Sequence, residues 1–172
     1  MARTPGARKL ALTAHVVASV GWLGAVAAFL AVAVAGLTSD DGQLVRAAYL
    51  AMELMGWSVI VPLGAASLLT GLIQSLGTPW GVFRHWWVLI KLVLTALAML
   101  LLLVHMRPIG FMASVAAESA VAPNDHRAVR VQLVFDAGAA LLVLLVNTTL
   151  SVYKPRGLTG YGQRRLREER AA

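Results

Sequence analysis

Cysteine is absent from this sequence of 172 residues, which excludes disulfides, thiolate metal ligands, Cys-linked haem and iron–sulfur clusters. Any metal would have to be held by His, carboxylate or Met side chains. Charged residues are also scarce, at 13% of the chain against 59% hydrophobic residues. That balance is wrong for a water-soluble domain of this length, so we expect most of the surface to face lipid.

Several familiar catalytic patterns are missing as well. The sequence has no P-loop, no Rossmann glycine pattern, no His-Glu-x-x-His helix and no Gly-x-Ser-x-Gly elbow. Nucleotide chemistry and hydrolysis of the soluble type are therefore not expected.

What the chain does have is four apolar stretches, each long enough to cross about 30 Å of hydrocarbon as an α-helix. They cover residues 10–37, 44–76, 86–106 and 128–153. We predict an all-α protein, a four-helix transmembrane bundle over 10–153, with basic cytoplasmic segments at 1–9 and 154–172. The first stretch is roughly twice the length of a signal-peptide core, which favours a spanning helix over a cleaved leader.

The predicted connections differ in length. Residues 38–42 are polar and residues 77–81 are rich in Gly and Pro, so both predict short turns between antiparallel neighbours. The third connection, 107–127, is longer, and we expect its apolar part from Phe111 to Ala116 to lie along the membrane interface.

Basic residues are distributed unevenly between the two predicted ends of the bundle. Ten Lys and Arg residues fall on the side of the termini and four on the other, which predicts both termini inside. The net charge of +7 is then a topology signal, and we expect no nucleic-acid partner. The basic tail is expected to be solvated or to bind lipid headgroups.

Five ionisable side chains stand out deep inside the predicted spans, where each costs on the order of 3 kcal/mol at mid-depth and needs a partner or a purpose. Counting from the helix centres puts two in the cytoplasmic half and three in the outer half. The inner pair is His15 and Lys91, and the outer three are Glu53, His105 and Asp136.

Helical phase predicts that these residues face the bundle interior. At 100° per residue, Lys91 and His105 fall within about 40° of each other, and Asp136 and Asn147 are nearly eclipsed. The same count aligns further polar and small residues on the first two spans: His15, Ser19, Trp22 and Val26, then Glu53, Trp57, Gly64 and Gly71. We expect Lys91 to pair with a carboxylate, a backbone carbonyl, Asn147 or a bound anion, or to extend toward the headgroups.

The four histidines suit haem binding in a helical bundle, which needs an imidazole ligand, an apolar slot and cationic partners for the propionates. His15 with His85 would form an inner site, and His105 with His126 an outer one. We take His15 and His105 as the candidate ligands of a metal or of haem b.

The stretch from His15 to Gly24 is similar to a first-helix His-x6-Trp-x-Gly pattern of small bacterial membrane proteins, including HemJ-type protoporphyrinogen oxidases and CopD-like copper-resistance domains. Residues 87–92, Trp-Val-Leu-Ile-Lys-Leu, resemble the Trp-x3-Lys-Leu of the HemJ type. The resemblance implies haem b, an axial role for His15, a functional Lys91 and a bacterial plasma-membrane location. The whole chain, especially 75–91, resembles a group of uncharacterised actinobacterial four-helix integral membrane proteins.

The leading hypothesis is a b-type haem-binding membrane protein that transfers electrons or handles porphyrin. A second is a small proton or ion transporter or channel subunit, with Glu53, Lys91 and Asp136 in a relay and assembly into a homo-oligomer. A third is a non-catalytic accessory subunit whose small-residue face, Ser67-xxx-Gly71, binds another membrane protein. Copper is a variant of the first, although the Met residues form no compact motif.

Overall fold

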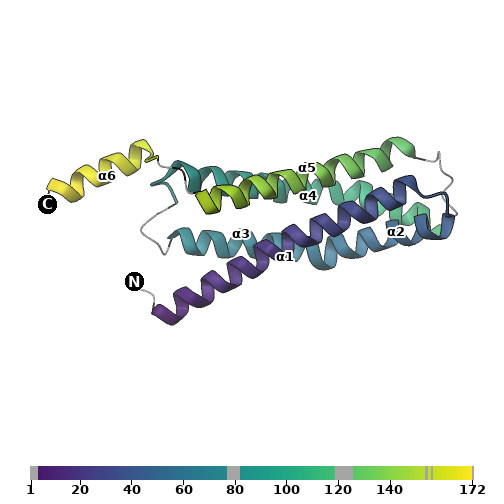
Figure 1. Cartoon of the computed structure of the whole chain (residues 1–172), viewed down its shortest axis with the longest axis horizontal. Helices are drawn as coiled ribbons and strands as arrows, with labels where there is room; N and C mark the ends of the chain where they lie inside the picture. Colours follow the sequence, from purple (N-terminus) through teal and green to yellow (C-terminus); the bar gives the residue numbers. More distant parts are fainter. Residues whose placement is uncertain (1–3, 77–81, 119–125, 154, 156, 172) are drawn as a thin grey trace.

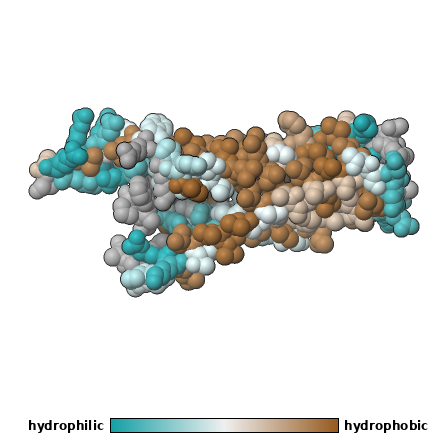
Figure 2. All heavy atoms as spheres, viewed as in Figure 1, coloured by the Kyte–Doolittle hydropathy of each residue, from teal (hydrophilic) through white to brown (hydrophobic). Residues whose placement is uncertain are grey.

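The computed structural model describes residues 4–76, 82–118, 126–153, 155 and 157–171, and over these residues the predicted all-α class is confirmed. In chain order the elements are α1 (Pro5–Thr38), α2 (Gly42–Met55), the π-helical turn η1 (Gly56–Ile60), α3 (Val61–Leu76), α4 (Trp86–Glu118), α5 (Arg127–Tyr153) and α6 (Gly160–Ala171). Because α2, η1 and α3 form one helix, the described residues contain four helices that are long and apolar enough to cross a membrane. Their sides are hydrophobic, and hydrophilic residues gather at the two ends of the bundle (Figures 1 and 2).

Two helices are longer than the sequence predicts. Helix α1 begins at Pro5 rather than Leu10, because the Thr4 hydroxyl accepts a hydrogen bond from a first-turn amide and Pro5 suits the first helical position. Helix α4 continues past the predicted end at Met106 to Glu118, despite Pro108. The expected interfacial segment is thus part of a helix.

This extension of α4 is held by packing and by a hydrogen bond at its end. Met112, Ala113 and Ala116 are buried in the bundle. The Arg46 side chain donates a hydrogen bond to the Ala117 carbonyl at 3.2 Å, which satisfies one of the carbonyls that a helix end leaves unpaired. The predicted turn at 77–81 lies outside the described residues.

The π turn explains why Trp57 does not follow the predicted phase. The Val61 amide bonds the Gly56 carbonyl five residues back, so this turn holds one residue more than an α-helical turn. It ends at Ile60, two residues before Pro62, whose ring would clash with the carbonyl four residues earlier in a regular helix. Trp57 was expected in the interior and is 53% exposed.

The four long helices form a ring of neighbours, in which α1 and α4 each contact the α2–α3 helix and α5. Both termini lie at one end of the bundle, which we call the terminal end (Figure 1). Toward the other end the buried core includes Trp22, Phe29, Tyr49 and Met112. Toward the terminal end α1 diverges from α5 (Figure 1).

Arg130 fixes the end of the bundle opposite to the termini, which we call the closed end. This side chain is only 1% exposed and donates hydrogen bonds to the Tyr49 hydroxyl at 2.9 Å and to the Gly36 carbonyl at 2.5 Å. Gly36 lies in the last turn of α1, where carbonyls lack helical partners. A guanidinium stabilises such a helix end by charge as well as by hydrogen bonding, so Arg130 ties α5 to α1 and α2.

Candidate functional site: a crevice around His15 and Lys91

A cavity of about 630 Å³ lies between the four long helices in the terminal half of the bundle. Both predicted inner residues, His15 from α1 and Lys91 from α4, line it. Its volume is typical of cavities that take small organic ligands and cofactors. The other polar side chains in its wall are Ser19, Ser67, Gln74, Ser75, Thr95, Asn147, Thr148 and Ser151, and most of the remaining wall is apolar.

The hydrogen bonds of His15 define which ring nitrogen carries the proton. Nδ1 lies 3.0 Å from the hydroxyl of Thr70, and that hydroxyl donates to the Ala66 carbonyl at 2.6 Å. Because the Thr70 proton is engaged there, the oxygen accepts from Nδ1–H. The proton is then on Nδ1 and Nε2 keeps its lone pair, as in histidines that bind metals.

Gly71 lets the His15 ring lie against α3. A Cβ atom at position 71 would lie 3.1 Å from His15 Cε1, closer than an ordinary contact. The hydroxyls of Ser19 and Ser67 bond each other at 2.8 Å one turn further along the same pair of helices. The small residues of α3 therefore serve the α1–α3 contact, whereas the accessory-subunit hypothesis expected Ser67 and Gly71 to face another protein.

Lys91 belongs to a polar chain between α4 and α5. Its ammonium donates to the Ser151 hydroxyl at 2.5 Å and lies 5.9 Å from the centre of a Trp87 ring. Asn147 donates to the Thr95 hydroxyl at 2.7 Å, and Thr95 donates to the Lys91 carbonyl at 2.8 Å. Asn147 was one of the partners expected for Lys91, but the ammonium bonds Ser151, and the Asn147 side chain is connected to Lys91 only through Thr95 and the Lys91 carbonyl.

The charge in the crevice is one-sided. Among the described residues that line it, Lys91 is cationic and none is Asp or Glu. Two buried atoms of lining residues, Asn147 Oδ1 and Trp22 Nε1, have no hydrogen-bond partner within the described part of the chain. Buried polar atoms are rarely left in this state, and of the two the Trp22 indole N–H is a donor that an anionic ligand could accept from, whereas Asn147 Oδ1 is an acceptor that needs a donor.

The predicted outer residues form a separate site. His105 and Asp136 line a smaller cavity of about 190 Å³, with His105 Nε2 2.9 Å from Asp136 Oδ2. His105 Nδ1 lies 2.6 Å from the Leu101 carbonyl, to which it must donate. His105 Nε2 thus faces a carboxylate oxygen, whereas no carboxylate is among the described residues that line the crevice around His15. Glu53 lies apart from this pair, with Oε1 3.4 Å from the Cβ position of Gly110.

The remaining two histidines lie at opposite ends of the bundle. His85 precedes α4, pairs through its backbone with Leu158, and is not among the residues that line the crevice. His126 precedes α5 and packs edge-on against Phe111, with ring centres 5.1 Å apart. The structure therefore does not bring His85 beside His15, or His126 beside His105, through any contact it defines.

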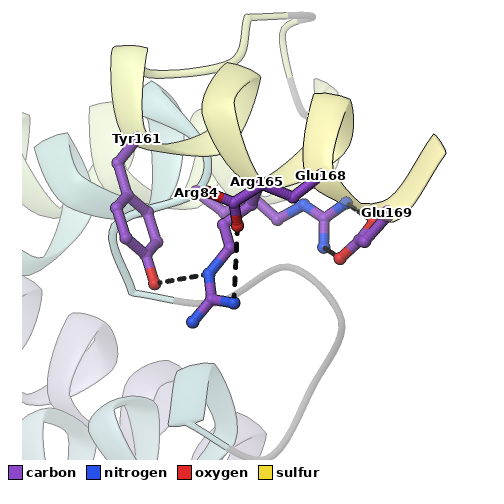
Figure 3. A network of polar contacts seen from close by, with 5 residues as sticks. All are labelled: Arg84, Tyr161, Arg165, Glu168 and Glu169. Carbon is purple, nitrogen blue, oxygen red and sulfur yellow. Dashed lines mark hydrogen bonds and ion pairs between the residues drawn. The ribbon is translucent and has the colours of Figure 1, made fainter. Parts of the chain in front are cut away.

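The C-terminal helix α6 docks on the segment that leads into α4. Arg84 makes a bidentate pair with Glu169 of α6 at 3.0 and 3.2 Å (Figure 3), and Thr159 bonds the backbone of Phe83 and Arg84. A Cβ at Gly162 would lie 2.3 Å from the Arg84 carbonyl, so only glycine fits. The basic tail thus forms a helix attached to the bundle, which the sequence did not predict.

The chain was compared with family models, curated proteins and solved structures, and no match was found in any of the three.

Proposed function

We propose that this chain is an integral membrane protein, with both termini on the cytoplasmic side, that binds haem b in the crevice around His15 and Lys91. The observation that carries the proposal is the state of His15. Its Nδ1–H is directed to Thr70, which leaves Nε2 its lone pair, and His15 lines a cavity of ligand size whose described lining includes the Lys91 ammonium and no carboxylate.

Membrane insertion is supported by composition and surface. Four helices in the described residues meet the length and hydropathy of a membrane span, and large apolar side chains are exposed along them. An exposed apolar surface of this extent is stable when lipid covers it. The excess of basic residues at the terminal end supports its placement in the cytoplasm.

The residues of the crevice fit haem b in three respects. His15 would hold the iron through a neutral imidazole nitrogen, and Thr70 fixes the orientation of that ring. Lys91 would supply a cation for the propionates, and the aliphatic wall would suit the macrocycle. When bound, haem would supply reversible one-electron chemistry, on which an electron-transfer role would depend, whereas a porphyrin-handling role would depend on binding alone.

The relay hypothesis gains less support from this arrangement. The cavity of Lys91 and that of Asp136 have two lining residues in common, Trp22 and Leu144, and neither is ionisable. Proton or ion relays need polar groups or water in succession. Among the described residues, the ionisable groups of the two cavities are instead separated by hydrophobic side chains.

The test is an absorption spectrum of the full chain purified in detergent after expression with ample haem, oxidised and then reduced with dithionite. We expect a Soret band that sharpens on reduction and is lost in His15→Ala. His126→Ala is the matched control, since that ring lies at the other end of the bundle, and it should keep the spectrum. A colourless wild-type protein, or a His15→Ala variant with an unchanged spectrum, would refute the proposal.

A further inference from the structure

The wall of the crevice is unequally exposed among the four helices that build it. Its lining residues from α3 and α4 are buried or half-buried without exception. Those exposed on the outside of the bundle come from α1 and α5: Leu12, Val16, Val20, Thr148 and Val152. The crevice therefore opens sideways, through a mouth between α1 and α5.

The course of the helices accounts for this mouth. At the closed end α1 and α5 are held together by Arg130 and by the shared core. Toward the terminal end α1 diverges from α5 (Figure 1). The gap between them is thus confined to the half of the bundle that contains His15 and Lys91.

The side chains at the mouth indicate whether it faces lipid or water. Four of its five residues are Leu or Val, and all lie within helices of membrane-spanning length and hydropathy. The polar groups, His15, Lys91 and Asn147, lie deeper, where lining residues are buried or half-buried. A mouth with an aliphatic rim and a polar interior suits an amphiphile that arrives from the acyl-chain region with its anionic part directed inward.

We infer that the ligand of this crevice enters and leaves laterally, from the lipid bilayer through the mouth between α1 and α5, and is an anionic amphiphile dissolved in the membrane. For haem b this inference rests on the proposed function. It adds a route: the cofactor partitions into the inner leaflet and passes between Val16 or Val20 and Val152 to reach His15.

The absence of cysteine allows a direct test by cross-linking across the mouth. Val16→Cys and Val152→Cys are combined, and the apo-protein in liposomes is bridged with a reductant-cleavable bis-maleimide. Bridging is expected to block uptake of haem from the vesicles, measured by the Soret band, and cleavage is expected to restore it. Each single-cysteine variant treated with the same reagent is the control and should load normally.

The outcomes separate the route from the ligand. A bridged protein that takes up haem as fast as the single variants would overturn the lateral route and leave the proposed function intact. An unbridged protein that takes up no haem would instead refute the proposed function, and the mouth is then tested without haem.

That second measurement uses a bimane label in vesicles whose lipids carry bromine on the acyl chains. Val152→Cys lies at the mouth, whereas Val88→Cys lines the same crevice from α4 and is half-buried. Brominated chains should quench the label at position 152 more strongly than at position 88. Equal quenching at the two positions would overturn the inference whatever the ligand is.

Discussion

Replacing Thr70 with Val tests the link between a hydroxyl on α3 and the state of His15. Valine has nearly the shape of threonine but cannot accept the hydrogen bond that His15 Nδ1 donates at 3.0 Å. The ring then loses its fixed orientation, and its proton is free to move to Nε2, which removes the lone pair from the crevice.

The size of the effect can be worked from this one contact. A buried donor left without an acceptor costs about 1–3 kcal/mol. Loss of a partner behind a metal-bound histidine lowers affinity by about 10- to 100-fold, which is the same energy range. Stability without haem should fall by no more than about 1–3 kcal/mol, the cost of that unpaired donor, because the hydroxyl otherwise bonds only backbone carbonyls of its own helix, chiefly that of Ala66.

The assay is a haem titration of the reconstituted apo-protein, followed by the Soret absorbance, with thermal unfolding measured on the same samples. Thr70→Ser keeps the hydroxyl and should bind like the wild type, whereas Thr70→Val should bind about 10- to 100-fold more weakly. Equal affinities for the two variants, in a protein that still requires His15, would refute the role assigned to Thr70.

Three further predictions concern other parts of the bundle. Lys91→Met should weaken binding of haem more than binding of haem dimethyl ester, because the ester lacks the negative propionate charges that the Lys91 ammonium would pair with. Equal losses of affinity in titrations with the two compounds would contradict this. Arg130→Met leaves the Gly36 carbonyl at the end of α1 without its donor and should cost about 2–5 kcal/mol of stability, seen as a lower unfolding temperature in detergent, with haem affinity of the surviving folded protein unchanged. Gly64→Val should cost about 1–3 kcal/mol, because even its Cβ would lie 3.0 Å from the Trp22 ring; an unfolding temperature equal to that of the wild type would show that the ring moves aside.

Much of the fold was predictable because the spans are set by long apolar runs, and such runs are strong signals. The ends of the helices were less predictable than the spans. The continuation of α4 through Pro108 depends on burial of residues such as Met112 and on the contact of Arg46 with a distant carbonyl, and neither is local in sequence. Helix α6 was missed because its attachment depends on Arg84, far away along the chain.

The candidate site was also predictable only in part. His15 and Lys91 stood out because ionisable residues are rare in apolar helices, and the predicted separation from His105 and Asp136 agrees with the two cavities. Thr70 gave no such signal, since its role follows from the phase of α3 after the π turn. A Thr one residue before Gly71, which was expected to face the bundle interior, was the available clue.

The π turn at Gly56–Ile60 also sets how much change the gene for this protein can tolerate. An α-helical turn in its place would hold one residue fewer, so every residue beyond it would be rotated by about 100°. Loss of one codon there would leave a helix of nearly the same length and hydropathy, and Thr70 and Gly71 would point away from His15. The reading frame would survive such a deletion, and the membrane span would too, but the crevice would lose one of its walls.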